Sequence, residues 1–299
     1  MGDIKLFQIQ KGKVAERSGT SVAVEKSLQK LIEDQMETFL GVRFLASEYG
    51  TGKRHGGRID SMGIDENGCP VIIEYKRALN ENVINQGLFY LDWLLDHKAE
   101  FKLLVMDKLG KKPPETIEWT SPRLLCIAGD FTKYDENAVQ QINRSIELIR
   151  YKKFGDDLLI LELVNATTAP EPVADKTDIY NYKTITETLG EIEGDILDRY
   201  EALKAFLLAL GDDVQTKTLK YYVAFKRIKN FACVELHPKK GTILVYIKID
   251  PATIKLENGF TRNVSKIGHF GTGELEITLR TDDDLEKAKR LIVKSYENS

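Results

Sequence analysis

Residues 58–76 constrain the fold more than any other part of the chain, because they contain two strand patterns joined by a hairpin signal. The tetrad Asp65-Glu66-Asn67-Gly68 separates the two patterns and predicts a tight turn. A loop centred on Asn67 pairs Asp65 with Cys69, and the same register places Asp60 opposite Glu74. Directly opposed Cβ atoms lie roughly 4.5–5.5 Å apart, so the predicted hairpin brings two carboxylates together.

Two like charges at this separation destabilise a sheet unless something compensates for them. A divalent cation bound by both carboxylates would do so, and oxygen ligands suit Mg²⁺ or Mn²⁺. Side chains alternate across a strand, so Lys76 shares the face of Glu74 and reaches the same space. The alternative is that Asp60 only ends a strand while Glu74 and Lys76 form a surface ion pair. The apolar run Val71-Ile72-Ile73 favours a buried strand, in which an unpaired Glu74 is costly.

Strand and helix patterns alternate along the first half of the chain, which predicts an α/β fold with a mixed sheet flanked by helices. The helix expected over 21–40 has Ser21 as its N-cap and ends at Gly41. The other elements expected in this half are an edge strand and loop over 1–20, strands over 42–49, 58–64, 70–76, 123–130, 146–151 and 157–163, and helices over 81–97, 98–109 and 135–145.

The composition changes at residues 165–184, which are rich in Thr, Pro and Ala and show no periodicity. We predict a linker there, between a first domain over 1–164 and a smaller α+β domain over 185–299. The elements expected in the second domain are helical residues 185–210, strands over 219–226, 231–236, 242–250 and 274–280, and a helix over 282–297.

The spacing of residues 57–77 resembles that of the PD-(D/E)xK nuclease superfamily, because Gly57-Arg58-Ile59-Asp60 is followed after thirteen residues by Glu74-Tyr75-Lys76-Arg77. It is more closely similar to the catalytic domain of NucS-type endonucleases, over Glu25 to about residue 163. The resemblance implies a restriction-endonuclease-like fold and metal-dependent hydrolysis of nucleic acid, with DNA as the expected substrate, in defence or repair. NucS-type enzymes carry a separate N-terminal DNA-binding domain, whereas about twenty residues precede the first predicted helix here. Mismatch recognition is therefore not expected.

The resemblance also implies a role for each residue of the motif. Mg²⁺ or Mn²⁺ would be bound by Asp60, Glu74 and the backbone carbonyl of Tyr75. Lys76 would stabilise developing negative charge and orient the nucleophile.

Helical residues complete the implied catalytic set. Glu25, on the first helix, matches a glutamate that completes the metal site of the family, with Glu33 and Glu37 as nearby alternatives. Gln86 and Tyr90 match a Gln and a Tyr of the family, with Gln86 implied in the catalytic set and Tyr90 in nucleic-acid binding. Residues four apart share one face of a helix. The alternative for this pair is an amphipathic core helix with a polar rim.

Basic side chains gather close to the motif. Lys53, Arg54, Arg58 and Arg77 are expected to contact backbone phosphates and to position the nucleic acid without reading its bases. The alternative is a cluster of solvated charges.

Residues 215–240 contain seven basic residues, one acid and several aromatics. Such a sheet binds single strands by stacking and charge, although aromatics are more often core residues. The segments Tyr221-Tyr222-Val223-Ala224-Phe225-Lys226, Asn230-Phe231-Ala232 and 267–273 resemble an uncharacterised C-terminal domain family, over about 185–299, that is often labelled "predicted transport protein". Three functions therefore remain open: a metal-dependent endonuclease, a catalytically inactive nucleic-acid-binding or regulatory protein on a nuclease fold, and a transport-associated protein.

The composition excludes several other classes of protein. The net charge of -3 argues against a histone-like coat, and no run approaches the ~18 apolar residues of a membrane helix. Cys69, Cys126 and Cys233 are too widely spaced for a disulfide framework or a zinc site, so we expect buried, reduced thiols in a cytoplasmic protein. No membrane partner is expected, and a homodimer remains an open alternative.

Overall fold

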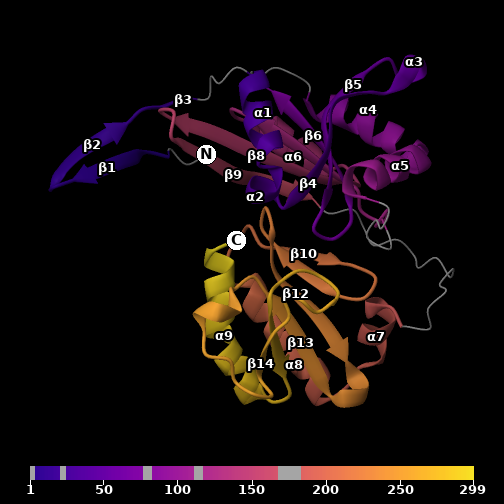
Figure 1. Cartoon of the computed structure of the whole chain (residues 1–299), viewed down its shortest axis with the longest axis vertical. Coiled ribbons are helices and arrows are strands. Elements are labelled where there is room, and N and C mark those ends of the chain that lie inside the picture. The colour runs from indigo at the N-terminus through magenta and orange to yellow at the C-terminus, as the bar shows by residue number, and fades with distance from the viewer. Residues whose placement is uncertain (1–3, 21–24, 77–82, 111–116, 168–182) are drawn as a thin grey trace. The chain divides into compact units, whose positions relative to one another are not determined.

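The computed structural model describes residues 4–20, 25–76, 83–110, 117–167 and 183–299, except for the side chains of Glu25 and Arg54. The chain divides into two compact units, Met1–Pro170 and Glu171–Ser299. Each unit has its own main sheet (Figure 1). Each unit also has its own hydrophobic core. Most of the predicted linker lies outside the described residues, and its first residues, 165–167, continue a strand.

A mixed seven-stranded sheet organises the N-terminal unit, in the order β3-β8-β7-β6-β5-β4 with β9 paired to β8. β6, β7 and β8 are parallel to one another, and the remaining pairs are antiparallel. The apolar runs of β6 and β7 are buried because parallel strands are covered on both faces. The strands of this sheet are β3 (Gly19–Thr20), β4 (Val42–Gly50), β5 (Arg58–Asp65), β6 (Pro70–Lys76), β7 (Arg123–Ala128), β8 (Ser145–Phe154) and β9 (Leu158–Thr167).

Helices lie against both faces of this sheet. α4 packs its apolar side chains with Ile72 and Leu124 in the main core, on one face of the sheet. α1 contacts Ser61 of β5, whose side chain points to the opposite face of the sheet. The helices of the unit are α1 (Glu25–Asp34), α2 (Met36–Leu40), α3 (Gly52–His55), α4 (Val83–Asp96), α5 (Lys98–Leu109) and α6 (Lys133–Gln140).

Two helix predictions need correction. The helix expected over 21–40 is interrupted at Gln35, whose φ of -136° is not helical, although Gly41 ends α2 as predicted with a φ of 63°. Ser21, the predicted N-cap, lies outside the described residues. α6 begins earlier than 135 because Thr132 caps it: the Thr132 hydroxyl accepts the N–H of Asp135, and the Asp135 carboxylate accepts the N–H of Thr132.

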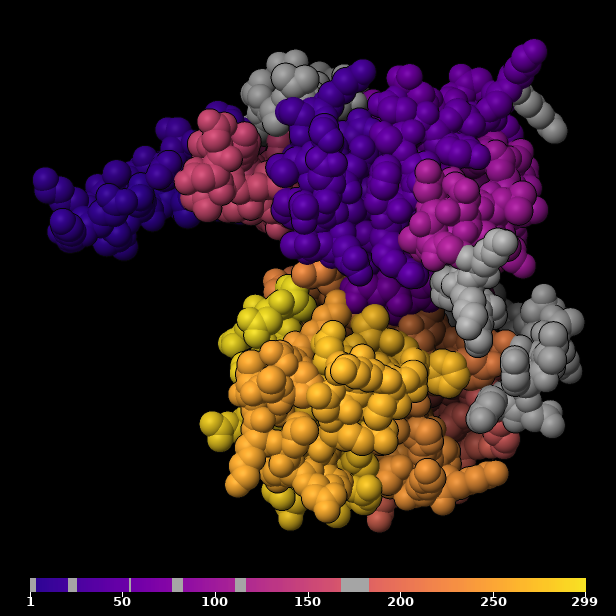
Figure 2. All heavy atoms as spheres, in the orientation of Figure 1, coloured from indigo at the N-terminus to yellow at the C-terminus, as the bar shows by residue number. Residues whose placement is uncertain are grey.

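The first twenty residues form more strand than predicted. β1 (Leu6–Gln10) and β2 (Lys13–Arg17) pair as a two-stranded hairpin, where a single edge strand and a loop were expected. Most side chains of this hairpin are exposed, as the indigo end of the chain shows in the space-filling view (Figure 2).

An antiparallel six-stranded sheet, in the order β10-β11-β12-β13-β15-β14, organises the C-terminal unit. The helical stretch predicted over 185–210 is broken before α8, where Gly194 has a φ of 60°. The strand predicted over 219–226 begins at Val223, because residues 219–222 form a turn, and neither β10 nor β14 was predicted. The elements are α7 (Ile185–Glu191), α8 (Asp195–Leu208), β10 (Gln215–Thr218), β11 (Val223–Lys226), β12 (Asn230–His237), η1 (Pro238–Lys240), β13 (Thr242–Ile247), η2 (Pro251–Thr253), β14 (Thr261–Asn263), β15 (Leu275–Leu279) and α9 (Asp282–Glu297).

The three cysteines, Cys69, Cys126 and Cys233, are buried, as the composition predicts, and none forms a disulfide. Within the described ranges, no helix is both long and apolar enough to cross a membrane.

Candidate active site

The hairpin of β5 and β6 has the predicted register. Ser61 pairs with Ile73 and Ile64 pairs with Pro70. The turn is closed by Asp65, whose N–H donates to the carbonyl of Cys69 at 2.9 Å and whose carboxylate accepts two backbone amides of the turn. This local bonding fixes which residues of the two strands face each other.

The same register, continued by one residue, places Asp60 opposite Glu74. The Asp60 N–H donates to Glu74 Oε1 at 3.2 Å, and the Tyr75 N–H donates to Asp60 Oδ2 at 3.0 Å. Glu74 is fully buried and Asp60 is half-buried. The two carboxylates are therefore held together by the backbone of the strands that carry them.

The electrostatics of Glu74 are unusual. Burial, and after it the charge of Asp60, raise the pKa of Glu74 to about 9 from an ordinary 4.5, while the Asp60 N–H and the charge of Lys76 act in the opposite direction. Among the residues that the structure describes, none makes a hydrogen bond to Glu74 Oε2. A buried carboxylate oxygen without a partner is costly, and a cation beside it would remove that cost.

Without a divalent cation, we expect the cost of burying the Glu74 carboxylate to make the free energy of unfolding depend on pH. A carboxyl group whose pKa is raised by folding contributes stability below its unfolded pKa of 4.5, and this contribution is lost as the pH rises toward 9. The isosteric change Glu74→Gln removes the titration. Urea unfolding in EDTA measures the free energy of unfolding of both proteins. The difference, variant minus parent, should increase by at least about 1 kcal/mol from about pH 5 to pH 8.5. The same gain in the exposed Glu37→Gln variant would contradict this assignment.

The acidic residues of α1 and α2 are placed differently from one another. Only the backbone of Glu25 is described, as the first residue of α1. Glu33 accepts a hydrogen bond of 2.6 Å from Ser61, which lies on the face of β5 opposite to Asp60, and Glu37 is exposed. The described geometry therefore brings neither alternative acid to the carboxylate pair.

Gln29, which sequence reasoning missed, contacts the same strand. Its side-chain amide donates to the Asp60 backbone carbonyl at 2.9 Å and to Glu33 at 3.0 Å, and the residue is buried. Gln29 thus fixes the backbone of Asp60 from α1. The position of Gln29 one turn before Ile32, at the edge of the apolar helical face, was the available signal.

Gln86 and Tyr90 contact each other on one face of α4, as their spacing predicts. Gln86 donates to the Tyr90 hydroxyl at 3.3 Å, and this hydroxyl accepts the Arg58 N–H at 3.1 Å. Tyr90 is buried in the main core. Its described contacts hold the first residue of β5 in place.

The predicted phosphate contacts are described only in part. Lys53 is exposed on α3, and Arg58 is exposed at the start of β5, where it pairs with Glu48. The side chain of Arg54 and all of Arg77 lie outside the described residues. Lys76 is half-buried and acts electrostatically on Glu74.

The donor set fits a small cation that keeps part of its own water shell. Across the described residues, no group of three or more His, Cys, Asp or Glu side chains is arranged to hold a metal ion. Asp60 and Glu74 supply two carboxylates, and Glu74 Oε2 has no described hydrogen-bond partner. Mg²⁺ usually binds one or two carboxylates and retains several waters, so this set fits Mg²⁺.

The aromatic residues of 215–240 belong mainly to the core of the C-terminal unit. Phe225 and Phe231 are fully buried there, so the core alternative applies to both. The Gly-rich residues 267–273 pack on the sheet, where His269 stacks on Tyr246 with centroids 4.3 Å apart.

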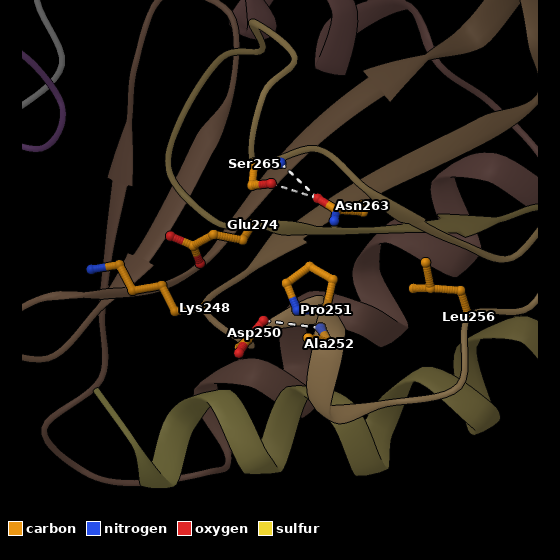
Figure 3. A pocket seen from close by; sticks show the side chains of 8 residues that line it. All are labelled: Lys248, Asp250, Pro251, Ala252, Leu256, Asn263, Ser265 and Glu274. Atoms are coloured by element: carbon orange, nitrogen blue, oxygen red, sulfur yellow. Dashed lines mark hydrogen bonds between the residues drawn. The ribbon is translucent and has the colours of Figure 1, made fainter.

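A pocket of about 560 Å³ lies beside β14 of the same unit (Figure 3). Lys248, Asp250, Asn263 and Glu274 contribute polar side chains to it. The Asp250 and Asn263 oxygens already accept the N–H groups of Ala252 and Ser265. The lining therefore combines both charge signs, and part of its hydrogen-bonding capacity is used within the unit.

One family model and two known proteins are similar to part or all of this chain. Residues 186–299 match the family described as "Domain of unknown function (DUF5655)". An uncharacterized protein of Haemophilus influenzae is 28% identical over 309 residues, which cover 99% of this chain and all of that protein. Among solved structures, a repair endonuclease from Pyrococcus abyssi matches 43% of this chain and 46% of its own, with 21% identity and a TM-score of 0.29. The chain thus spans less than half of that endonuclease.

Proposed function

We propose that the N-terminal unit is a divalent-metal-dependent nuclease with a restriction-endonuclease-like fold, and that DNA is its substrate. The observation that carries the proposal is the backbone-locked pair of Asp60 and Glu74, with one buried Glu74 oxygen unpartnered among described residues. Like charges placed together in a sheet reduce stability, so their presence favours a function that needs them. The spacing of Asp60, Glu74 and Lys76 resembles that of PD-(D/E)xK nucleases.

Asp60 and Glu74 would hold Mg²⁺ together with the Tyr75 carbonyl. When bound, the ion supplies Lewis-acid stabilisation of the phosphate and lowers the pKa of water. Lys76, on the face of Glu74, would place its ammonium group against the negative charge that develops on the phosphate. Arg58 would hold the neighbouring phosphate of the strand, while Gln86 and Tyr90 keep the β5 backbone in position. Glu25 remains the proposed third carboxylate.

The test combines cleavage with metal-linked stability. We expect the full chain to cut labelled DNA in Mg²⁺ or Mn²⁺ and to be inactive in excess EDTA. Mg²⁺ should also stabilise the protein, by about 2.7 kcal/mol at 100 times its dissociation constant. Glu74→Gln should abolish this gain, whereas Glu37→Gln, a matched change at an exposed carboxylate, should retain it. Cleavage that persists in EDTA would overturn the proposed mechanism, and metal binding without cleavage would favour an inactive nucleic-acid-binding protein.

A further inference from the structure

We propose that Phe89, His55 and His97 form a stacking platform for one unpaired nucleobase beside the Asp60–Glu74 pair. The inference rests on the proposed function, because it takes a nucleic acid as the ligand. The platform adds a requirement that the carboxylate pair does not impose: the base of the nucleotide beside it must be unpaired.

The platform is a connected group of rings with one exposed edge. Phe89 is 46% exposed on α4, and its ring centroid lies 5.3 Å from that of His55 on α3. His55 in turn lies 6.0 Å from His97, which stacks on Trp93 at 4.6 Å with nearly parallel planes. Trp93 is 2% exposed and forms the base of the group. An aromatic ring exposed over a rigid base is available for stacking.

The loop that carries His55 is held firmly over α4. Thr51 N–H donates to the Gly57 carbonyl at 3.0 Å, and Gly57 N–H donates to the Thr51 hydroxyl at 3.0 Å. An added Cβ at Gly57 would lie 2.5 Å from the Tyr90 ring, so the loop backbone and α4 are in close contact. His55 is therefore positioned by the fold, and the platform is largely formed before a ligand binds.

The same contacts connect the platform to the strand that carries Asp60. Tyr90 is 5.8 Å from Phe89, centroid to centroid, and its hydroxyl accepts the N–H of Arg58, two residues before Asp60. The exposed cations Lys53 and Arg58 lie on the same loop and strand as His55 and Asp60. The phosphates and the bases of a single strand are both accessible, so cations can bind its phosphates while exposed rings stack on its bases.

The bases of a duplex cannot stack on this platform while they remain paired. Paired bases are stacked on their neighbours, so their faces reach a protein ring only after unstacking or flipping. Stacking of unpaired bases tolerates any sequence, because every base has a π-face. The platform thus implies a preference for unpaired nucleotides without a sequence preference.

Binding, measured separately from cleavage, tests the inference. The full chain carrying Asp60→Ala, with 2-aminopurine-labelled single-stranded DNA, single-stranded RNA and duplex DNA as probes, gives affinities by anisotropy and stacking by quenched emission. We expect Phe89→Ala in this background to weaken single-strand binding by about tenfold and to reduce quenching. Duplex binding should change less than twofold, and Phe89→Trp should restore both signals. Phe44→Ala removes another partly exposed aromatic, at 38% exposure, and should have no effect.

Three results would overturn the platform: equal loss of single-strand and duplex binding in Phe89→Ala, no loss in that variant, or the same loss in Phe44→Ala. Absence of nucleic-acid binding by the parent chain would overturn it as well. Single-strand binding through Phe89 without metal-dependent cleavage by the wild-type chain would support the platform and remove the nuclease proposal. Cleavage and affinity that are both unchanged in Phe89→Ala would support the nuclease proposal and overturn the platform.

Discussion

Asp60→Asn should reduce DNA cleavage by on the order of 1,000-fold while leaving the fold intact. The asparagine side chain retains an oxygen for the Tyr75 N–H, which Asp60 now accepts at 3.0 Å, but it removes one charge from the cation site. Loss of several kcal/mol of charge stabilisation in the transition state corresponds to this rate change. Initial rates in Mg²⁺ on a labelled oligonucleotide would measure it.

Asp156→Asn is the matched control for this experiment. Asp156 is fully exposed in the turn after β8 and pairs with Lys153 at the surface. It undergoes the same change of charge and should cut at the parent rate. If Asp60→Asn cuts as fast as this control, the carboxylate pair has no part in catalysis.

Arg123→Ala should lower the free energy of unfolding by about 3–5 kcal/mol, because it leaves two buried carboxylates without the cation between them. Arg123 donates to Asp65 at 2.9 Å and to both oxygens of Glu147 at 2.7 and 2.8 Å, and all three residues are at most 3% exposed. The two carboxylates hold the pKa of Arg123 above its usual range despite burial. Urea unfolding followed by circular dichroism would measure the loss.

Arg150 offers a matched comparison in the same sheet. It also binds two carboxylates, Asp130 and Glu162, but these are 34% and 36% exposed. Solvent screening limits such pairs to about 1 kcal/mol or less, so Arg150→Ala should be much milder. Equal losses in the two variants would show that burial does not set the strength of the Arg123 network.

Local sequence signals were sufficient to predict the strands and register of the hairpin. The strand patterns of β5 and β6 and the tetrad beginning at Asp65 are contiguous, so their pairing depends on a turn of a few residues. The contact between Gln86 and Tyr90 followed from helical spacing in the same way. The cation site and the roles of these residues remain predictions.

Contacts between distant segments could not be predicted from such patterns. Arg123 and Asp65 are hydrogen-bonded but lie 58 residues apart in the sequence, and Gln29 and Asp60 lie 31 residues apart. No helical or strand periodicity in the sequence links either pair. Asp65 was interpreted only as a turn residue, although one oxygen serves the turn and the other binds Arg123. The grouping of His55 with Phe89 depends on how α3 lies over α4, which composition does not specify.

The turn at Asp65 also determines which changes of chain length this protein can tolerate over evolution. β6 is held on its other side by β7, where Glu74 pairs with Cys126, so a residue gained or lost in the turn must be absorbed by β5. A shift of one position moves β5 by about 3.3 Å and transfers every one of its side chains to the opposite face. Asp60 would then point away from Glu74. Insertions and deletions between these two acids should therefore be purged in lineages that keep the activity, while substitutions that preserve the spacing accumulate.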